Sequence, residues 1–226
     1  MAKVKFGMMM TDASGKLGGQ VFAKNRGGSY VRTKGIPSNP QTTAQMYIRG
    51  IFASISSGWS TLNESARLGW NNAVSGFATT DVFGDLRNPS GKALYQKLNQ
   101  NLAISGQAGI TVAPQPSEVP FAQLNEVTGD ASTPLLEVTL DGDTTGSKIV
   151  VWATRPLSQG TSFVKNDLRQ IGDFAGAAPG TIEITNVYTD KFGAFAAGDN
   201  IVIGVRVINA NGQASPLETK KAVIVA

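Results

Sequence analysis

The sequence predicts an α+β fold, in which an extended N-terminal β-hairpin arm and a small helical domain precede a C-terminal β-sandwich. Three observations support this expectation. A basic, glycine-rich stretch contains two strand-like runs, the next stretch has the spacing of amphipathic helices, and the C-terminal part consists of short β-branched runs between turns. The expected domains are the arm at 1–40, the helical domain at 41–113 and the sandwich at 121–226.

The arm combines turn residues with two predicted strands. Gln20 to Lys24 and Ser29 to Thr33 are joined by Asn25-Arg26-Gly27-Gly28, and Asn and Gly accept the left-handed backbone that tight hairpin turns need. The following segment, Gly35 to Pro40, carries two prolines three residues apart, which keep it extended and stiff. Because a lone hairpin is marginally stable in water, we expect added strands from this chain or from a neighbour.

Charge is unevenly distributed along the chain. The net charge is +4, but residues 1–40 hold seven cations against one acid, so that residues 41–226 sum to −2. A basic arm on a nearly neutral body suits an acidic protein surface or a nucleic acid. The alternative is a solvated turn that happens to carry a few lysines.

A nucleic-acid ribbon is a further interpretation of the arm. Its cations interleave with two rings: Lys24, Arg26, Arg32 and Lys34 with Phe22 and Tyr30. Such a ribbon could stack bases, but so few cations give only modest, salt-sensitive affinity. In a hairpin we expect the two rings to pack on the helices instead, so nucleic acid is the less favoured partner.

Apolar spacing predicts three helices. The first begins at Thr42 or Thr43 and stops near Gly58, and a capping box at Thr61–Glu64 starts the second, so we expect an antiparallel helical hairpin. Ser90 is expected to cap the third helix. The apolar stripes are Ala44, Ile48, Ile51, Phe52, Ile55 and Trp59; Leu62, Ala66, Trp70, Ala73 and Phe77; and Leu94, Leu98 and Leu102.

After Pro114, Pro116 and Pro120 the helical period disappears and strands are predicted. About seven short strands rich in Val, Ile and Thr are typical of an immunoglobulin-like or fibronectin-like sandwich, here without the cysteine pair of antibody domains. Trp152 is expected to pack between the two sheets. The clearest strand candidates are 135–140, 148–153, 167–174, 181–187, 200–208 and 220–225, with an Asn211-Gly212 hairpin signal before the last.

The residue types argue against an enzyme. Cysteine and histidine are absent, which removes thiolate ligands, disulfides and the commonest general base. Gly15, Gly18 and Gly19 precede a predicted strand rather than the helix that a phosphate loop needs. Asp141-Gly142-Asp143 could bind calcium, but a hairpin turn is the better interpretation. We therefore expect no catalytic residue, no cofactor, no metal and, without a long apolar run, no membrane contact.

The first 105 residues or so are similar to a set of tailed-bacteriophage and prophage proteins. The likeness lies in GKLGGQVFAKNRGGSYVR, PSNPQTTAQMYIR, WSTLNESARLGW and SGKALYQKLNQNL. The matching positions are Gly15, Gly18, Gly19, Asn25, Arg26, Gly28, Tyr30, Arg32, Pro37, Asn39, Pro40, Thr42, Gln45, Arg49, Trp59, Arg67 and Trp70. The remainder resembles immunoglobulin-like modules, which phages often append to structural proteins. The resemblance implies a virion component assembled in the host cytoplasm.

We therefore expect a non-enzymatic, multi-copy virion protein of the head–tail connector or tail, which assembles with itself and with other virion proteins through its arm. The alternatives are a capsid decoration or head-fibre protein, an architectural nucleic-acid-binding protein, and a glycan-adhesion module with exposed Tyr188, Phe192 and Phe195. The expected assembly contacts are Lys16, Lys24, Arg26, Tyr30, Arg32, Pro37 and Pro40.

Overall fold

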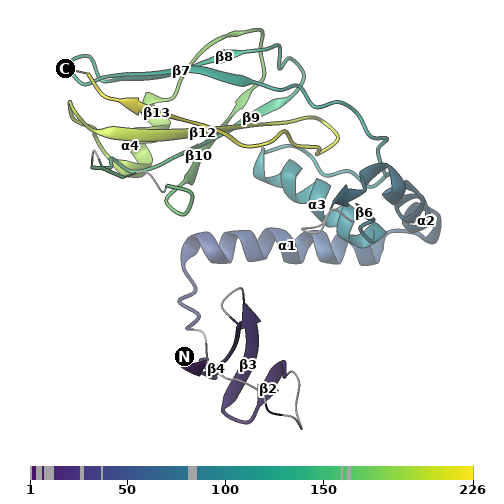
Figure 1. Cartoon of the computed structure of the whole chain (residues 1–226). Helices are drawn as coiled ribbons and strands as arrows, with labels where there is room; N and C mark the ends of the chain where they lie inside the picture. Colours follow the sequence, from purple (N-terminus) through teal and green to yellow (C-terminus); the bar gives the residue numbers. More distant parts are fainter. Residues whose placement is uncertain are drawn as a thin grey trace. The chain divides into compact units, whose positions relative to one another are not determined.

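The computed structural model (Figure 1) describes residues 2–3, 7, 13–25, 28–36, 38–80, 86–158, 160–161 and 164–225. Helices and several antiparallel sheets occur in these residues, so the predicted α+β class is confirmed. The chain forms two compact units, Met1–Met46 and Tyr47–Ala226.

The first unit is an antiparallel sheet with the strand order β1-β4-β3-β2. Its strands are β1 (Ala2–Lys3), β2 (Gly15–Leu17), β3 (Gln20–Asn25) and β4 (Gly28–Thr33). The predicted hairpin is therefore confirmed, and β1 and β2 supply its added strands from the same chain. Gly15 and Gly28 have φ angles of 113° and 103°, which only glycine adopts readily. None of the unit's described residues is buried.

Helix α1 (Thr43–Thr61) begins where the sequence predicts, but it does not stop at Gly58. Gly58 instead lies inside the helix and against Tyr95, where a Cβ atom would be 2.9 Å from the tyrosine oxygen, so this position favours glycine for close packing. Thr61 belongs to the last turn of α1 and donates its hydroxyl hydrogen to the carbonyl oxygen of Gly58. The predicted capping box is thus wrong, since Asn63 caps the next helix by accepting from the amide of Ala66 at 2.8 Å.

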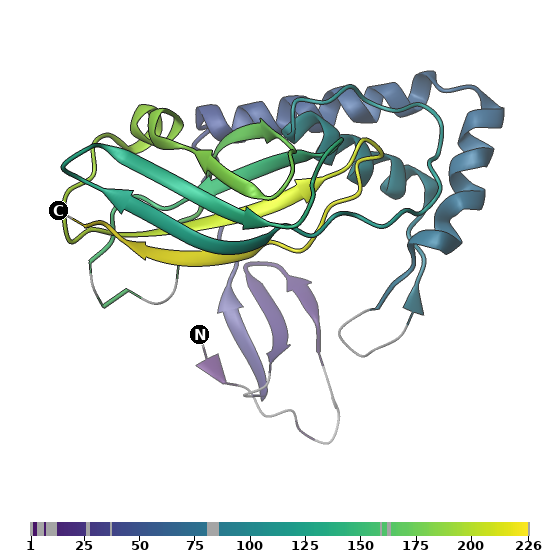
Figure 2. The same ribbon diagram turned by 90° about the horizontal axis from the view of Figure 1, so that it is seen from above.

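The second helix does not fold back along the first. Helix α2 (Glu64–Ala73) turns away from α1 (Figure 2) and packs on α3 (Gly91–Ile104), so the predicted antiparallel hairpin is wrong. The physical reason is the aromatic centre at Tyr95, whose ring lies 5.4 Å from Trp59 and 5.3 Å from Trp70. The short 3-10 helix η1 (Val74–Phe77) and the ribbon of β5 (Thr79–Thr80) and β6 (Leu86–Arg87) connect α2 to α3.

Ser90 caps α3 as predicted, accepting from the amide of Ala93 at 3.2 Å. The predicted stripe of Leu94, Leu98 and Leu102 is fully buried. Asn99 is buried as well, because its side chain bonds the backbone of Ile110 in both directions, at 2.7 and 3.1 Å. That pair of hydrogen bonds holds the segment after α3 against the helices.

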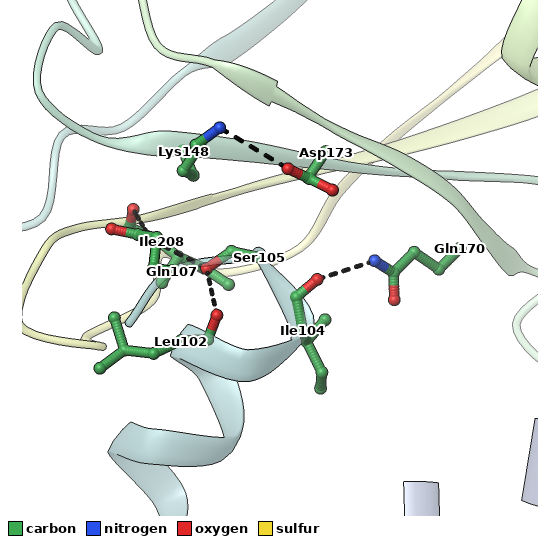
Figure 3. Close-up of polar contacts among 8 residues, drawn as sticks. All are labelled: Leu102, Ile104, Ser105, Gln107, Lys148, Gln170, Asp173 and Ile208. Atoms are coloured by element: carbon green, nitrogen blue, oxygen red, sulfur yellow. Dashed lines mark hydrogen bonds and ion pairs between the residues drawn. The ribbon is translucent and has the colours of Figure 1, made fainter. Parts of the chain in front are cut away.

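The C-terminal end of α3 packs against the four-stranded sheet of the sandwich (Figure 3). The side chain of Gln170 donates to the carbonyl oxygen of Ile104 at 3.0 Å, and that of Gln107 donates to Ser105 and Ile208. Beside this contact, Lys148 and Asp173 form an ion pair in which Nζ and Oδ2 are 3.7 Å apart. Helices and sandwich therefore share one packed unit.

Two antiparallel sheets form the sandwich, with the strand orders β11-β8-β7 and β10-β9-β12-β13. Alternate side chains of both sheets meet in one core, for example Val138 and Leu140 with Ile203 and Val205. Burying each such aliphatic side chain contributes about 1.5–3 kcal/mol. The strands are β7 (Gln123–Asp130), β8 (Leu135–Asp141), β9 (Lys148–Ala153), β10 (Arg169–Ala175), β11 (Gly180–Glu183), β12 (Asn200–Ile208) and β13 (Glu218–Val223).

Two expectations for the sandwich are wrong. Trp152 does not lie between the sheets: Ile149, Val151 and Ala153 face the core, and Trp152 lies on the other face of β9 with the Arg206 guanidinium 5.9 Å from its ring. Part of the predicted strand at 181–187 belongs instead to helix α4 (Thr185–Phe192).

Candidate assembly surfaces

Strand register divides the N-terminal sheet into two chemically different faces. Lys16 pairs with Val21 and Val21 pairs with Arg32, so these side chains share one face across three strands. Tyr30 pairs with Ala23 on the same face, which we call the basic face. Lys16 and Arg32 are exposed, and each lies on a strand that flanks β3.

The opposite side of this sheet, the apolar face, carries Leu17, Phe22 and Val31. Phe22 pairs with Val31, and the next row joins Leu17 to Gln20. Leu17 is 71% exposed, and Phe22 and Val31 are only half-buried. A sheet that leaves such side chains in water gains little from the hydrophobic effect until a partner covers it.

The register brings together three of the predicted assembly residues. Lys16, Tyr30 and Arg32 share the basic face, whereas Lys24 lies on the side of Phe22. Pro40 is exposed in the segment before α1. Arg26 and Pro37 lie outside the described residues. Phe22 and Tyr30, the two rings of the predicted nucleic-acid ribbon, point to opposite faces of the sheet.

Helix α1 exposes part of its apolar stripe. Ile55 and Trp59, toward its C-terminal end, pack on the buried cluster around Trp70 and Tyr95. Toward the N-terminal end, Ile48 is 40% exposed and Phe52 is 48% exposed. The stripe was predicted, but not that α3 covers only half of it.

A second sheet face is acidic. On the outer face of the sheet β11-β8-β7, Thr128 pairs with Glu137 and Glu137 pairs with Glu183. The next row joins Glu126, Thr139 and Thr181, with the two threonine hydroxyls 3.2 Å apart. We call these six residues the acidic face. Sequence reasoning missed this face because it requires β11 to pair with β8, a strand that lies far from it in the chain.

The remaining candidates of the sequence are structural. Tyr188 is fully buried, Phe195 is 9% exposed and Phe192 packs on the core, so none of these three candidates for glycan adhesion is an exposed aromatic side chain. In the Asp141–Asp143 turn, hydrogen bonds from the side chain and amide of Thr145 lower the pKa of Asp143. Thr144 bonds the backbone of Ala177.

The same pattern recurs at Asp130, where hydrogen bonds from Ser132 and Thr133 lower the pKa of the carboxyl group to about 2. Within the described part of the chain, no group of three or more acidic residues is placed to hold a metal ion. The described helices include none with the length and hydropathy needed to cross a bilayer.

Comparison with known proteins gives no match to a family, to a curated protein or to a solved structure.

Proposed function

We propose that this chain is a non-enzymatic structural subunit that assembles in many copies through its N-terminal sheet. One observation carries the proposal: none of the sheet's described residues is buried, and its two faces differ in chemistry. An isolated sheet of this kind is marginal in water, whereas covering Leu17, Phe22 and Val31 in an assembly would contribute about 1.5–3 kcal/mol for each side chain fully buried. Assembly is the simplest use of such a sheet.

The particle we propose is the virion of a tailed bacteriophage, with the chain in the head–tail connector or the tail. The support is the resemblance of GKLGGQVFAKNRGGSYVR and the following motifs to proteins of such phages and prophages. A capsid decoration or head-fibre protein is the alternative within the virion. Negative-stain imaging of particles with an antibody against the sandwich separates them, and label on the capsid facets would contradict the connector or tail position.

We further propose that the sandwich is immunoglobulin-like. Its first, second and fifth strands form one sheet and its third, fourth, sixth and seventh form the other, which supports this topology. In addition, the amide of Val225 donates to the carbonyl oxygen of Gly129, so the chain end after β13 pairs in parallel with β7 across the open side. An experimental structure with another strand order would contradict the assignment.

The test of assembly uses the full chain. Sedimentation velocity over a wide concentration range is expected to show oligomers, and limited proteolysis is expected to cut residues 1–40 in the monomer and spare them in the oligomer. A single-chain mass at every concentration, or equal cleavage of both species, would overturn the proposal.

A nucleic-acid-binding role predicts a different result. DNA should then be shifted in a gel at low salt and released when Lys24, Arg26 and Arg32 are changed to Ala. The matched control changes Lys92 and Lys97, two exposed cations of α3, to Ala. Absence of any shift at low salt removes this alternative.

A further inference from the structure

We infer that the acidic face of the sandwich is the surface on which the basic face of a second copy docks. This inference rests on the proposed function, because it names the partner surface of the N-terminal sheet. Three observations lead to it: unrelieved negative charge on one sheet face, complementary charge on another, and the absence of the helices from the side of the sandwich that carries the acidic face.

The acidic face places like charges side by side. Glu137 and Glu183 are directly opposite each other on neighbouring antiparallel strands, an arrangement that destabilises a sheet unless a cation relieves it. Glu126 lies on β7, the other neighbour of β8, and is diagonally across from Glu137. None of these three carboxylates has an ion-pair partner among the described residues. Lys220 reaches the edge of this face but donates to the carbonyl oxygen of Asn125.

The basic face offers the complementary pattern. Lys16 and Arg32 lie two strands apart with the small Val21 between them, a separation of about 9–10 Å at the usual strand spacing. Glu126 and Glu183 also lie on the two strands that flank β8, in neighbouring rows rather than directly across from each other. An arginine can bind a carboxylate through two parallel hydrogen bonds. The three threonine side chains of the acidic face are short enough to let a second sheet approach it.

The acidic face and the helices lie on opposite sides of the second unit, so the helices leave the acidic face open to the basic face of a second copy. The second unit is layered: α3 packs on part of the outer face of the sheet β10-β9-β12-β13, and the acidic face is the outer face of the other sheet. Helix α1 packs on α3 and lies on the side of the sandwich opposite β7 and β8 (Figure 1).

The basic face of one copy and the acidic face of the next make a head-to-tail contact. Such a contact uses two different patches and is not self-complementary, so it repeats from copy to copy and closes into a ring or continues as a stack. It also depends on charge, so we expect it to weaken as salt rises from about 0.05 M to about 0.5 M, over which the Debye length shortens severalfold.

The test is an exchange of charge between full-length variants. K16E/R32E and E137K/E183K should each raise the concentration needed for association on the order of 100-fold, because like charges would then face each other. E118K/D190K makes the same change of charge as E137K/E183K at exposed positions away from the acidic face, and should associate as wild type. An equimolar mixture of K16E/R32E and E137K/E183K should associate again, since opposite charges face each other at both kinds of contact.

The possible outcomes separate the two proposals. A monomeric wild-type chain overturns both. Association that is lost in K16E/R32E but kept in E137K/E183K, or two weakened variants that do not rescue each other, overturns this inference and leaves assembly through the N-terminal sheet intact. Crosslinking a mixture of ¹⁴N- and ¹⁵N-labelled wild-type chains should join Lys16 to Glu137 across isotopes. Crosslinks only within one isotope would mean that a chain binds its own acidic face, and would overturn the inference.

Discussion

Asn101 of α3 donates a hydrogen bond at 2.8 Å to the carbonyl oxygen of Gly212, in the loop between β12 and β13. The same loop packs closely against the helix: a Cβ atom at residue 212 would overlap the carbonyl oxygen of Leu98. These contacts connect the helices to the sandwich across more than a hundred residues of sequence. Substitutions at these residues therefore test how much the contact between helices and sandwich stabilises the protein.

Gly212→Ala should destabilise the protein for two reasons, positive φ and lack of space. Gly212 has a φ of 76°, a conformation that costs a residue with a Cβ atom about 1–2 kcal/mol. The overlap with Leu98 should add about 1–3 kcal/mol. Gly146→Ala is the matched control, with a φ of 79° and open space around it. Urea unfolding measures both, and equal losses for the two variants would contradict the close contact.

Tyr188 should make the protein sensitive to alkali. Burial, followed by the charge of Asp199, raises the pKa of Tyr188 above its ordinary value of 10.0. The unfolded chain then releases this proton near pH 10 while the folded chain keeps it, so the stabilisation is complete below about pH 10 and declines at higher pH.

The matching variant is Tyr188→Phe, which removes the hydroxyl that donates to the carbonyl oxygen of Thr154 at 3.0 Å. It should cost about 1–3 kcal/mol at neutral pH, because a buried acceptor loses its donor. The free energy of unfolding of this variant should also decrease less above pH 10 than that of the wild type. Tyr47→Phe, at a 61% exposed site, serves as control. An unchanged alkaline slope in Tyr188→Phe would contradict the assignment.

Asn99→Ala should loosen the segment after α3. The substitution leaves the partly buried amide and carbonyl groups of Ile110 without their side-chain partners, which costs about 1 kcal/mol for each group. Hydrogen exchange at Ile110 should become faster. Asn72→Ala, at an exposed position of α2, should change neither quantity. Unchanged exchange at Ile110 in Asn99→Ala would show that its side chain does not hold the segment.

The two halves of α1 should respond differently to the same substitution. Ile55→Gln should cost about 2–4 kcal/mol, because Ile55 packs on the cluster around Trp70. Ile48→Gln, two turns earlier on the same stripe, should change the free energy of unfolding of the monomer by less than about 1 kcal/mol, since Ile48 is 40% exposed. Thermal unfolding at low protein concentration compares the two variants. A similar loss of stability in both would mean that the N-terminal half of α1 is covered as well.

The sequence was most informative where local signals agree with tertiary packing. The hairpin of β3 and β4, the Ser90 cap of α3 and the strand β12 follow from turn chemistry, capping and β-branched runs, and all three form as predicted. Helix α4 was missed because Thr181–Val187 is rich in β-branched residues. Long-range contacts override that preference, since Thr185 bonds Leu136 and Tyr188 fills the core.

Faces were harder to predict than elements. The run that contains Trp152 is apolar on both sides, so its pattern does not say which side meets the core, and α3 covers part of the outer side of its sheet. The basic face needs the register of three strands to separate Tyr30 from Phe22. The acidic face needs residues 126, 137 and 183 to meet on neighbouring strands, which no local pattern encodes.

Asn25 pairs with Gly28, so two residues separate the paired ends of β3 and β4 in the sequence. This number determines which side chains of β4 share a face with which side chains of β3. One extra residue there would slide β4 by one position against β3 and turn Tyr30 and Arg32 toward the side of Phe22. The folded sheet would keep its composition and total charge, yet Arg32 would no longer share a face with Lys16. Loop length, rather than any single side chain, thus determines which chemistry the arm presents to its neighbour.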